Sequence, residues 1–199
     1  MKLCLALLRS RLLVFSSSRL LLYSSSAPPP LIVLGIDPGT AVTGYGVVVS
    51  GSRGTHSLVE CGVIRTRARD PLAARLAEIF DGVSELLERH QPQALAVEDV
   101  FYAKNMRTTI TLGHARGVIL LAGQRAGLSI HEYPPAEIKK AVCGTGIATK
   151  EQVQFMVARL LRLKTPPSPS DAADGVAAAL TCLMSIHLSS LTQPLMRRR

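Results

Sequence analysis

Three short apolar runs separated by turn residues open the part of the sequence that begins at residue 31. They are LIVLGID at 31–37, YGVVVS at 45–50 and SLVECGVIRT at 57–66, and each has the length and composition of a strand. The link between the last two contains the glycines of 51–54. Because short connections favour antiparallel neighbours, we expect three adjacent antiparallel strands.

An amphipathic helix is predicted after residue 70. Apolar residues recur at three- and four-residue spacing between Leu72 and Leu87. Asp70 is placed to act as the N-cap, and Pro71 to occupy the first helical position. The run LAVEDVF at 95–101 then has the continuous apolar character of a strand in a sheet that is covered on both faces.

The remaining sequence adds one strand and four helices. A helix is predicted at 105–126 and a strand at 128–133, and three more helices at 135–142, 149–163 and 171–188. The alternation of helix and strand implies that part of the sheet is parallel. The predicted fold class is therefore α/β, with a mixed five-stranded sheet flanked by helices.

Local signals mark the boundaries of the last helices. Thr149 and Gln152 are spaced as a capping box at the start of one helix. Repeated prolines within 164–170 can extend neither neighbouring helix, so this segment is predicted to be a loop.

The two ends of the chain differ from the predicted domain at 31–188. Residues 1–30 are basic, rich in Leu and Ser and free of acids, and residues 189–199 form a basic tail. Arginines recur within any stretch of about 20 residues that a helix needs to cross a bilayer, which argues against a membrane span. The leader fits either an organellar transit peptide or a misassigned upstream start.

Charge and cysteine usage limit the possible partners. The formal net charge is +9, but seven of the 23 basic residues lie in the leader and the tail. If DNA is the partner, the remaining bases must be segregated onto one face. The cysteines have no C-x-x-C pair, so neither a zinc site nor a disulfide framework is predicted.

Four carboxylates occur where ordinary solvated surface does not explain them. We call Asp37, Glu98, Asp171 and Asp174 the acidic quartet. Asp37 ends one apolar run and Glu98 interrupts another, while the aspartates of DAAD lie on one face of a helix. The alternatives are a turn role for Asp37 and interaction of the DAAD acids with the helix dipole.

The acidic quartet predicts a site for a hard divalent cation. Oxygen ligands without His or Cys suit Mg²⁺, with Mn²⁺ as a substitute, rather than zinc. Alternation along the strand sends Asp99 to the face opposite Glu98, which shares its face with Ala96. In two-metal nucleases such ions bracket a scissile phosphate, so phosphodiester hydrolysis is the predicted chemistry.

Candidate DNA contacts surround these acids. Aromatic rings that can stack on bases and donors for phosphate follow the Glu98 strand, although the rings could also pack in the core. Three lysines flank the glycine-bearing segment 144–146. The candidates are Phe101, Tyr102, Lys104, Asn105, Arg107, Lys139, Lys140 and Lys150.

Gly113 and Gly117 interrupt the helix predicted at 105–126. Each glycine costs about 1 kcal/mol relative to Ala in a helix interior, which implies a gain elsewhere. Close packing against a helix of the same subunit or of a dimer partner is the predicted gain. The alternative is a weak or broken helix.

Five blocks of the sequence, in this order, resemble the RuvC family of Holliday-junction resolvases. They are GIDPGTAVTGYGVV, AVEDVFYAKN, LGHARGV, KKAVCGTGIATKEQVQFMV and DAADGVAAAL. The resemblance covers roughly residues 31–188 and implies a ribonuclease-H-like fold. It also implies a homodimer with two active sites and Mg²⁺-dependent, symmetric nicking of four-way DNA junctions in recombination and repair.

Site residues follow from the same resemblance. The acidic quartet matches the metal-binding acids of the family, Lys139 and Lys150 match catalytic lysines, and Phe101 matches a junction-contacting aromatic. Bacterial relatives work with a branch-migration motor, RuvA with RuvB. We therefore expect a cytoplasmic bacterial protein, or a mitochondrial or chloroplast one if the leader is a transit peptide.

Three other functions share part of this sequence pattern. A related ribonuclease-H-like nuclease that acts on structured RNA shares an opening Asp-x-Gly strand, but the segment GTGIATKEQVQ argues against it. An actin-like ATPase requires a second domain, for which 199 residues leave no room. A non-catalytic junction-binding module would not require an acid cluster.

Overall fold

A mixed five-stranded sheet forms the centre of the domain. The computed structural model describes residues 29–99 and 106–192, and the strand order is β3-β2-β1-β4-β5. The strands are β1 (Ile32–Asp37), β2 (Val42–Ser50), β3 (His56–Arg65), β4 (Ala94–Glu98) and β5 (Ser129–Tyr133). The first three strands pair antiparallel, and β4 and β5 continue the sheet parallel to β1. The predicted mixed sheet is confirmed.

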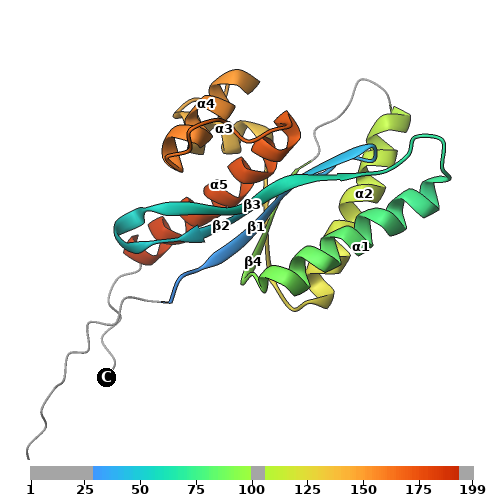
Figure 1. The fold of residues 1–199 in the computed structure, drawn as a ribbon, viewed down its shortest axis with the longest axis horizontal. Coiled ribbons are helices and arrows are strands. Elements are labelled where there is room, and N and C mark those ends of the chain that lie inside the picture. Colours follow the sequence, from blue (N-terminus) through green and yellow to red (C-terminus); the bar gives the residue numbers. More distant parts are fainter. Residues whose placement is uncertain (1–28, 100–105, 193–199) are drawn as a thin grey trace, which may run out of the picture.

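Helices cover both faces of this sheet. One face carries α1 (Leu72–His90) and α2 (Met106–Arg125), while α5 (Ser170–Thr192) crosses the other (Figure 1). Two shorter helices, α3 (Pro135–Cys143) and α4 (Lys150–Leu160), pack against α5. A short 3-10 turn, η1 (Ser52–Gly54), connects β2 to β3. In the described ranges no helix is long and apolar enough to cross a membrane.

Alternation along the strands divides the apolar side chains between two cores. Val33 and Ala96 belong to the core beneath α5, whereas Leu34, Ile36 and Leu95 belong to the core beneath α1 and α2. Odd-numbered β1 residues and even-numbered β4 residues therefore face α5. This assignment places Asp37 and Glu98 on the same face of the sheet.

Several predicted boundaries need correction. The N-cap of α1 is Pro71, and Asp70 makes no capping bond, so the predicted N-cap was wrong. The Asp70 N–H instead donates to the carbonyl of Arg67, 3.0 Å away, which places Asp70 in a turn before the helix. The strand predicted at 95–101 ends at Glu98, and its last residues lie outside the described ranges.

Two other local predictions were correct. Thr149 and Gln152 form the expected capping box at the start of α4. The second helix continues through Gly113 and Gly117, so it is not broken there. Most of the leader (1–28) and the tail residues 193–199 lie outside the described ranges.

Candidate active site

The start of α5 is seated directly on the ends of the central strands. A Cβ atom at Gly44 would lie 1.9 Å from the carbonyl oxygen of Asp171, and one at Gly175 would lie 2.6 Å from the Cα of Tyr45. No side chain fits at such distances, so two glycines allow the helix and strand backbones to touch. Since Gly44 pairs with Asp37 in the sheet, this contact carries the first turn of α5 to the end of β1.

The acidic quartet converges on that edge from three elements. Asp37 is the last residue of β1 and Glu98 is the last residue of β4. Asp171 and Asp174 belong to the first turns of α5. The charges of Asp171 and Asp174 both act on Asp37, and those of Asp37 and Asp174 act on Glu98.

Crowding and burial change the acidity of the two strand carboxylates. Burial raises the pKa of Asp37 to about 7, an effect that Asp174 and Asp171 reinforce and Lys150 opposes. Burial likewise raises the pKa of Glu98 to about 8, and the negative charges of Asp37 and Asp174 add to this rise. The pKa values of these two carboxyl groups thus lie near neutral pH, and such strongly raised values are typical of a functional site.

Two predicted lysines bear on the same acids. Lys150, the first residue of α4, places its Nζ 3.0 Å from Asp174 Oδ2. This hydrogen bond raises the pKa of Lys150. The charge of Lys139, on α3, lowers the pKa of Glu98. Both lysines therefore act electrostatically on the acidic quartet.

The donor set fits a hard divalent cation. Its members carry only carboxylate oxygens, and their mutual repulsion is the kind that a metal ion relieves. Within residues 29–99 and 106–192, no three His, Cys, Asp or Glu side chains are grouped closely enough to hold an ion together. Ligation by three members of the quartet therefore requires side-chain movement.

A salt-bridge cluster anchors the end of β4 on the opposite face. Arg116 of α2 lies 3.2 Å from Asp99 Oδ1 and also pairs with Glu132 of β5. Asp99 follows Glu98 directly, so Arg116 fixes the backbone that presents Glu98. Arg116 was not among the predicted site residues, although the predicted orientation of Asp99 toward the other face indicated a need for a cationic partner there.

The structure places the predicted DNA contacts only in part. Phe101, Tyr102, Lys104 and Asn105 lie outside the described residues. Arg107 is exposed in the first turn of α2. Lys140 is exposed on α3, one residue after Lys139.

The helix α2 exposes an apolar stripe. Cβ atoms at Gly113 and Gly117 would meet nothing within 4 Å, so packing against a helix of the same subunit, one of the two predicted partners, is wrong. Met106, Ile110 and Leu121 are exposed by 78%, 56% and 51%. Their spacing puts them on the same helix face as the glycines.

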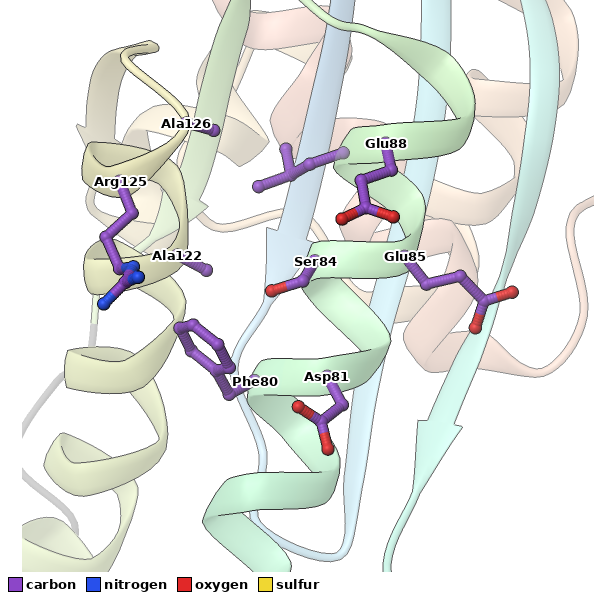
Figure 2. A pocket seen from close by; sticks show the side chains of 9 residues that line it. Phe80, Asp81, Ser84, Glu85, Glu88, Ala122, Arg125 and Ala126 are labelled. Atoms are coloured by element: carbon purple, nitrogen blue, oxygen red, sulfur yellow. The ribbon is translucent and has the colours of Figure 1, made fainter.

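A groove of about 540 Å³ separates α1 from α2 on the sheet face opposite the quartet. Figure 2 shows Phe80 pointing from α1 toward α2, with the carboxylates of Asp81, Glu85 and Glu88 along α1. Arg125 of α2 also lines this α1–α2 groove. Its excess of acids makes it unsuitable for the phosphate backbone of DNA.

Comparison with known proteins matches this arrangement to one family. The sequence model described as "Crossover junction endodeoxyribonuclease RuvC" matches residues 33–182, a range that contains the whole acidic quartet. The chain belongs to the RuvC family. It is thereby a structure-specific endodeoxyribonuclease, and the recognition made from the five sequence blocks is confirmed.

This chain matches individual members of the RuvC family over most of their length. The crossover junction endodeoxyribonuclease RuvC of Pelotomaculum thermopropionicum is 47% identical over 151 residues, which are 75% of this chain and 91% of that protein. The Thermus thermophilus RuvC structure superposes with a TM-score of 0.75 at 36% identity, covering 80% of this chain and 97% of that one. The structure of T. thermophilus RuvC in complex with a Holliday junction substrate superposes with a TM-score of 0.72 at 34% identity, and the match covers 79% of this chain and 96% of that one. These neighbours confirm the ribonuclease-H-like fold class.

Proposed function

We propose that this chain resolves four-way DNA junctions by paired, symmetric nicks, with the acidic quartet as its catalytic centre. The observation that carries the proposal is the convergence of Asp37, Glu98, Asp171 and Asp174 on one sheet edge in a chain of the RuvC family. T. thermophilus RuvC, which has the same fold as this chain, forms a complex with a Holliday junction substrate, and this supports the choice of substrate.

The quartet would hold Mg²⁺, or Mn²⁺ as a substitute. Bound ions of this kind activate an attacking water and stabilise the leaving oxygen of a phosphodiester. Asp37 and Glu98 present their carboxylates from a fixed backbone because each ends a strand of the central sheet. Lys150 and Lys139 supply positive charge beside them, which suits the negative charge that develops on a phosphate in hydrolysis.

DNA contacts are proposed on both sides of this centre. Arg107 and Lys140 are exposed donors for backbone phosphates. We assign a junction contact also to Phe101, on the strength of the family resemblance. Tyr102, Lys104 and Asn105 are assigned contacts because they add a ring that can stack on a base and donors for phosphate directly after the Glu98 strand.

Paired nicking requires two active sites, and we propose a homodimer formed through α2. The exposed apolar stripe of Met106, Ile110 and Leu121 supports this assignment, and the bare backbone at Gly113 and Gly117 allows a second helix to approach closely. Residues 31–188 are proposed as the nuclease domain of each subunit.

The biological setting follows from the relatives. The relative compared above is bacterial, so we propose action in the bacterial cytoplasm beside the branch-migration motor RuvA with RuvB. Import into an organelle is the alternative for a functional leader. Mass spectrometry of the mature amino terminus distinguishes the two, because cleavage near Pro30 indicates import.

The decisive test is the Asp37→Asn variant on a synthetic four-way junction with Mg²⁺. We expect retained junction binding in a gel-shift assay and at least a 100-fold loss of cleavage, by analogy with the loss of other transition-state stabilising groups. Asp81→Asn, in the α1–α2 groove, is the matched control and should cut like the wild type. Full cutting by Asp37→Asn would refute the metal role, and preferential cutting of structured RNA would refute the substrate.

A further inference from the structure

An arginine-rich segment at the end of β3 lies beside the candidate active site without belonging to it. In the sheet Asp37 pairs with Gly44 and Gly44 pairs with Val63, so Val63 is two strands away from Asp37. Two strand spacings amount to about 10 Å. Arg65 lies two residues beyond Val63, about 7 Å farther toward the edge at which β1 ends.

Arg65 stands on the same face of the sheet as the acidic quartet. Gly46 contacts Val176 of α5, and its β3 partner Cys61 packs against the core beneath α5. Since side chains alternate along a strand, Arg65, four residues after Cys61, projects from that same face. Its own partner in the sheet is Val42, the first residue of β2.

Hydrogen bonds tie this segment to the turn that follows Asp37. The Thr66 hydroxyl donates to the carbonyl of Thr40, and the Thr66 N–H donates to the carbonyl of Ala41 at 3.1 Å. Arg75 Nε in turn donates to Thr66 Oγ1 at 2.9 Å. The base of the arginine segment is therefore held in fixed relation to Asp37.

The guanidinium groups of this segment are available to a ligand. Arg65, Arg67 and Arg69 are all exposed. In the described part of the chain neither Arg65 nor Arg67 forms an ion pair with an acid, and only Arg69 lies near one, 4.0 Å from Asp70. Guanidinium groups bind phosphate oxygens through paired N–H donors, and the acids of the α1–α2 groove are on the other face.

We propose that Arg65, Arg67 and Arg69 form a phosphate-binding edge that holds a duplex arm of the DNA beside the acidic quartet. This inference rests on the proposed junction-cleaving function and extends its DNA surface to β3. Because guanidinium–phosphate contacts carry no sequence information, the edge adds affinity and fixes orientation without choosing the cleavage position.

The test is the salt dependence of DNA binding by the full chain. We would compare wild type, Arg65→Gln, Arg67→Gln and the double variant on a four-way junction and on a linear duplex, in EDTA. Each lost phosphate contact reduces the magnitude of the slope of log K against log salt concentration by about 0.9. The slope of the double variant should therefore be smaller in magnitude than that of the wild type by about 1.8. We expect its Kd to rise about tenfold or more at 0.15 M salt on both DNAs.

Arg125→Gln is the matched control, since Arg125 is exposed on the opposite sheet face. Its slope should equal that of the wild type, and all variants should melt within about 2 °C of it. Salt slopes of the Arg65 and Arg67 variants that equal the wild-type slope would overturn the proposed phosphate-binding edge. If the wild-type protein cleaves junctions in the same experiments, the proposed function still holds. Wild type that neither binds nor cuts junctions overturns the function itself.

Cleavage at saturating protein provides the second readout. With Mg²⁺ and all junctions bound, the double variant should nick at the wild-type positions and within about twofold of the wild-type rate, because it retains the acidic quartet. A variant that binds with the wild-type slope but cuts slowly would place these arginines in the chemistry and refute a backbone-holding role.

Discussion

The backbone of Gly44 lies so close to Asp171 that no side chain can be placed between them. A methyl group at position 44 would overlap the carbonyl oxygen of Asp171 at 1.9 Å, and backbone atoms cannot move aside as a side chain can. The position of one half of the acidic quartet relative to the other therefore depends on the absence of a Cβ at this point.

We predict that Gly44→Ala displaces the start of α5. Overpacking of this kind costs typically about 1–3 kcal/mol of folding stability. Cleavage should fall more than stability alone explains, because Asp171 moves away from Asp37. Chemical denaturation and junction cleavage at a temperature where both proteins are folded measure the two effects.

Gly51→Ala is the control for that variant. Its Cβ would meet first the hydroxyl of the exposed Thr55 side chain, so relief costs at most the exposed hydrogen bond of that hydroxyl to the Ser52 carbonyl and does not require backbone atoms of a helix to move. Stability and cleavage should remain near wild type. Equal behaviour of the two alanine variants would show that close backbone approach at Gly44 does not position the site.

Stability of the metal-free protein should decrease as pH rises from about 4 to about 8. The pKa of Asp37 is raised to about 7 and that of Glu98 to about 8, so the folded state retains protons that the unfolded chain releases. The stabilisation is complete below the unfolded pKa values and is lost as pH passes through the folded ones. We expect a loss of several kcal/mol across this range, because one unit of pKa shift corresponds to about 1.4 kcal/mol.

Urea denaturation at several pH values in EDTA measures this dependence. The double variant Asp37→Asn with Glu98→Gln should show a flatter profile, whereas Asp81→Asn should follow the wild type. A wild-type profile that rises with pH between 5 and 8 would contradict the raised pKa values. Added Mg²⁺ should stabilise the wild type most at the alkaline end, where the quartet is ionised.

Arg116→Met should loosen the end of β4. The substitution removes the common partner of Asp99 and Glu132, whose side chains are 44% and 42% exposed, so the stability loss should be modest, about 1 kcal/mol. The larger effect should be a higher Mg²⁺ concentration for half-maximal cleavage, because Glu98 is no longer held by its neighbour. A Mg²⁺ titration of cleavage measures it.

Arg125→Met, at the last residue of the same helix, controls for loss of a guanidinium group from α2. It should titrate like the wild type. An Arg116→Met curve that overlays the wild-type curve would show that the cluster serves stability alone.

Ile110→Glu should convert the protein to monomers. A carboxylate in the apolar stripe of α2 would be buried without a partner in the proposed dimer, which costs several kcal/mol per interface. Sedimentation velocity measures the change of mass, and cruciform plasmid cleavage distinguishes single nicks from paired ones. Ala77→Glu on the exposed side of α1 should leave both unchanged, and a dimeric Ile110→Glu would refute the α2 interface.

Local patterns predicted the elements of this fold well because each depends on nearby residues. The alternation in β1 and the capping box of Thr149 with Gln152 are formed within a few positions of one another. Asp70 was misassigned as an N-cap because Pro71 occupies the cap position itself, and Asp70 lies in the preceding turn.

Contacts between distant elements were harder to predict. The quartet could be predicted because Asp37 and Glu98 are acidic residues within or at the end of apolar runs, and this local pattern indicates a buried charge. Nothing local pairs Gly44 with Asp171 or Arg116 with Asp99, since both contacts depend on how helices lie on the sheet. The glycines of the GYG segment were the available signal for close helix packing.

The glycine contact beneath α5 has a consequence for redesign of this enzyme. The backbone contacts at Gly44 and Gly175 set the position of the α5 carboxylates relative to the strand carboxylates, so we expect substitutions at either glycine to displace these donor atoms rather than to change their ion preference. Libraries aimed at altered metal selectivity should therefore diversify α3 and α4 around Lys139 and Lys150, whose charges act on the quartet, and keep the two glycines constant.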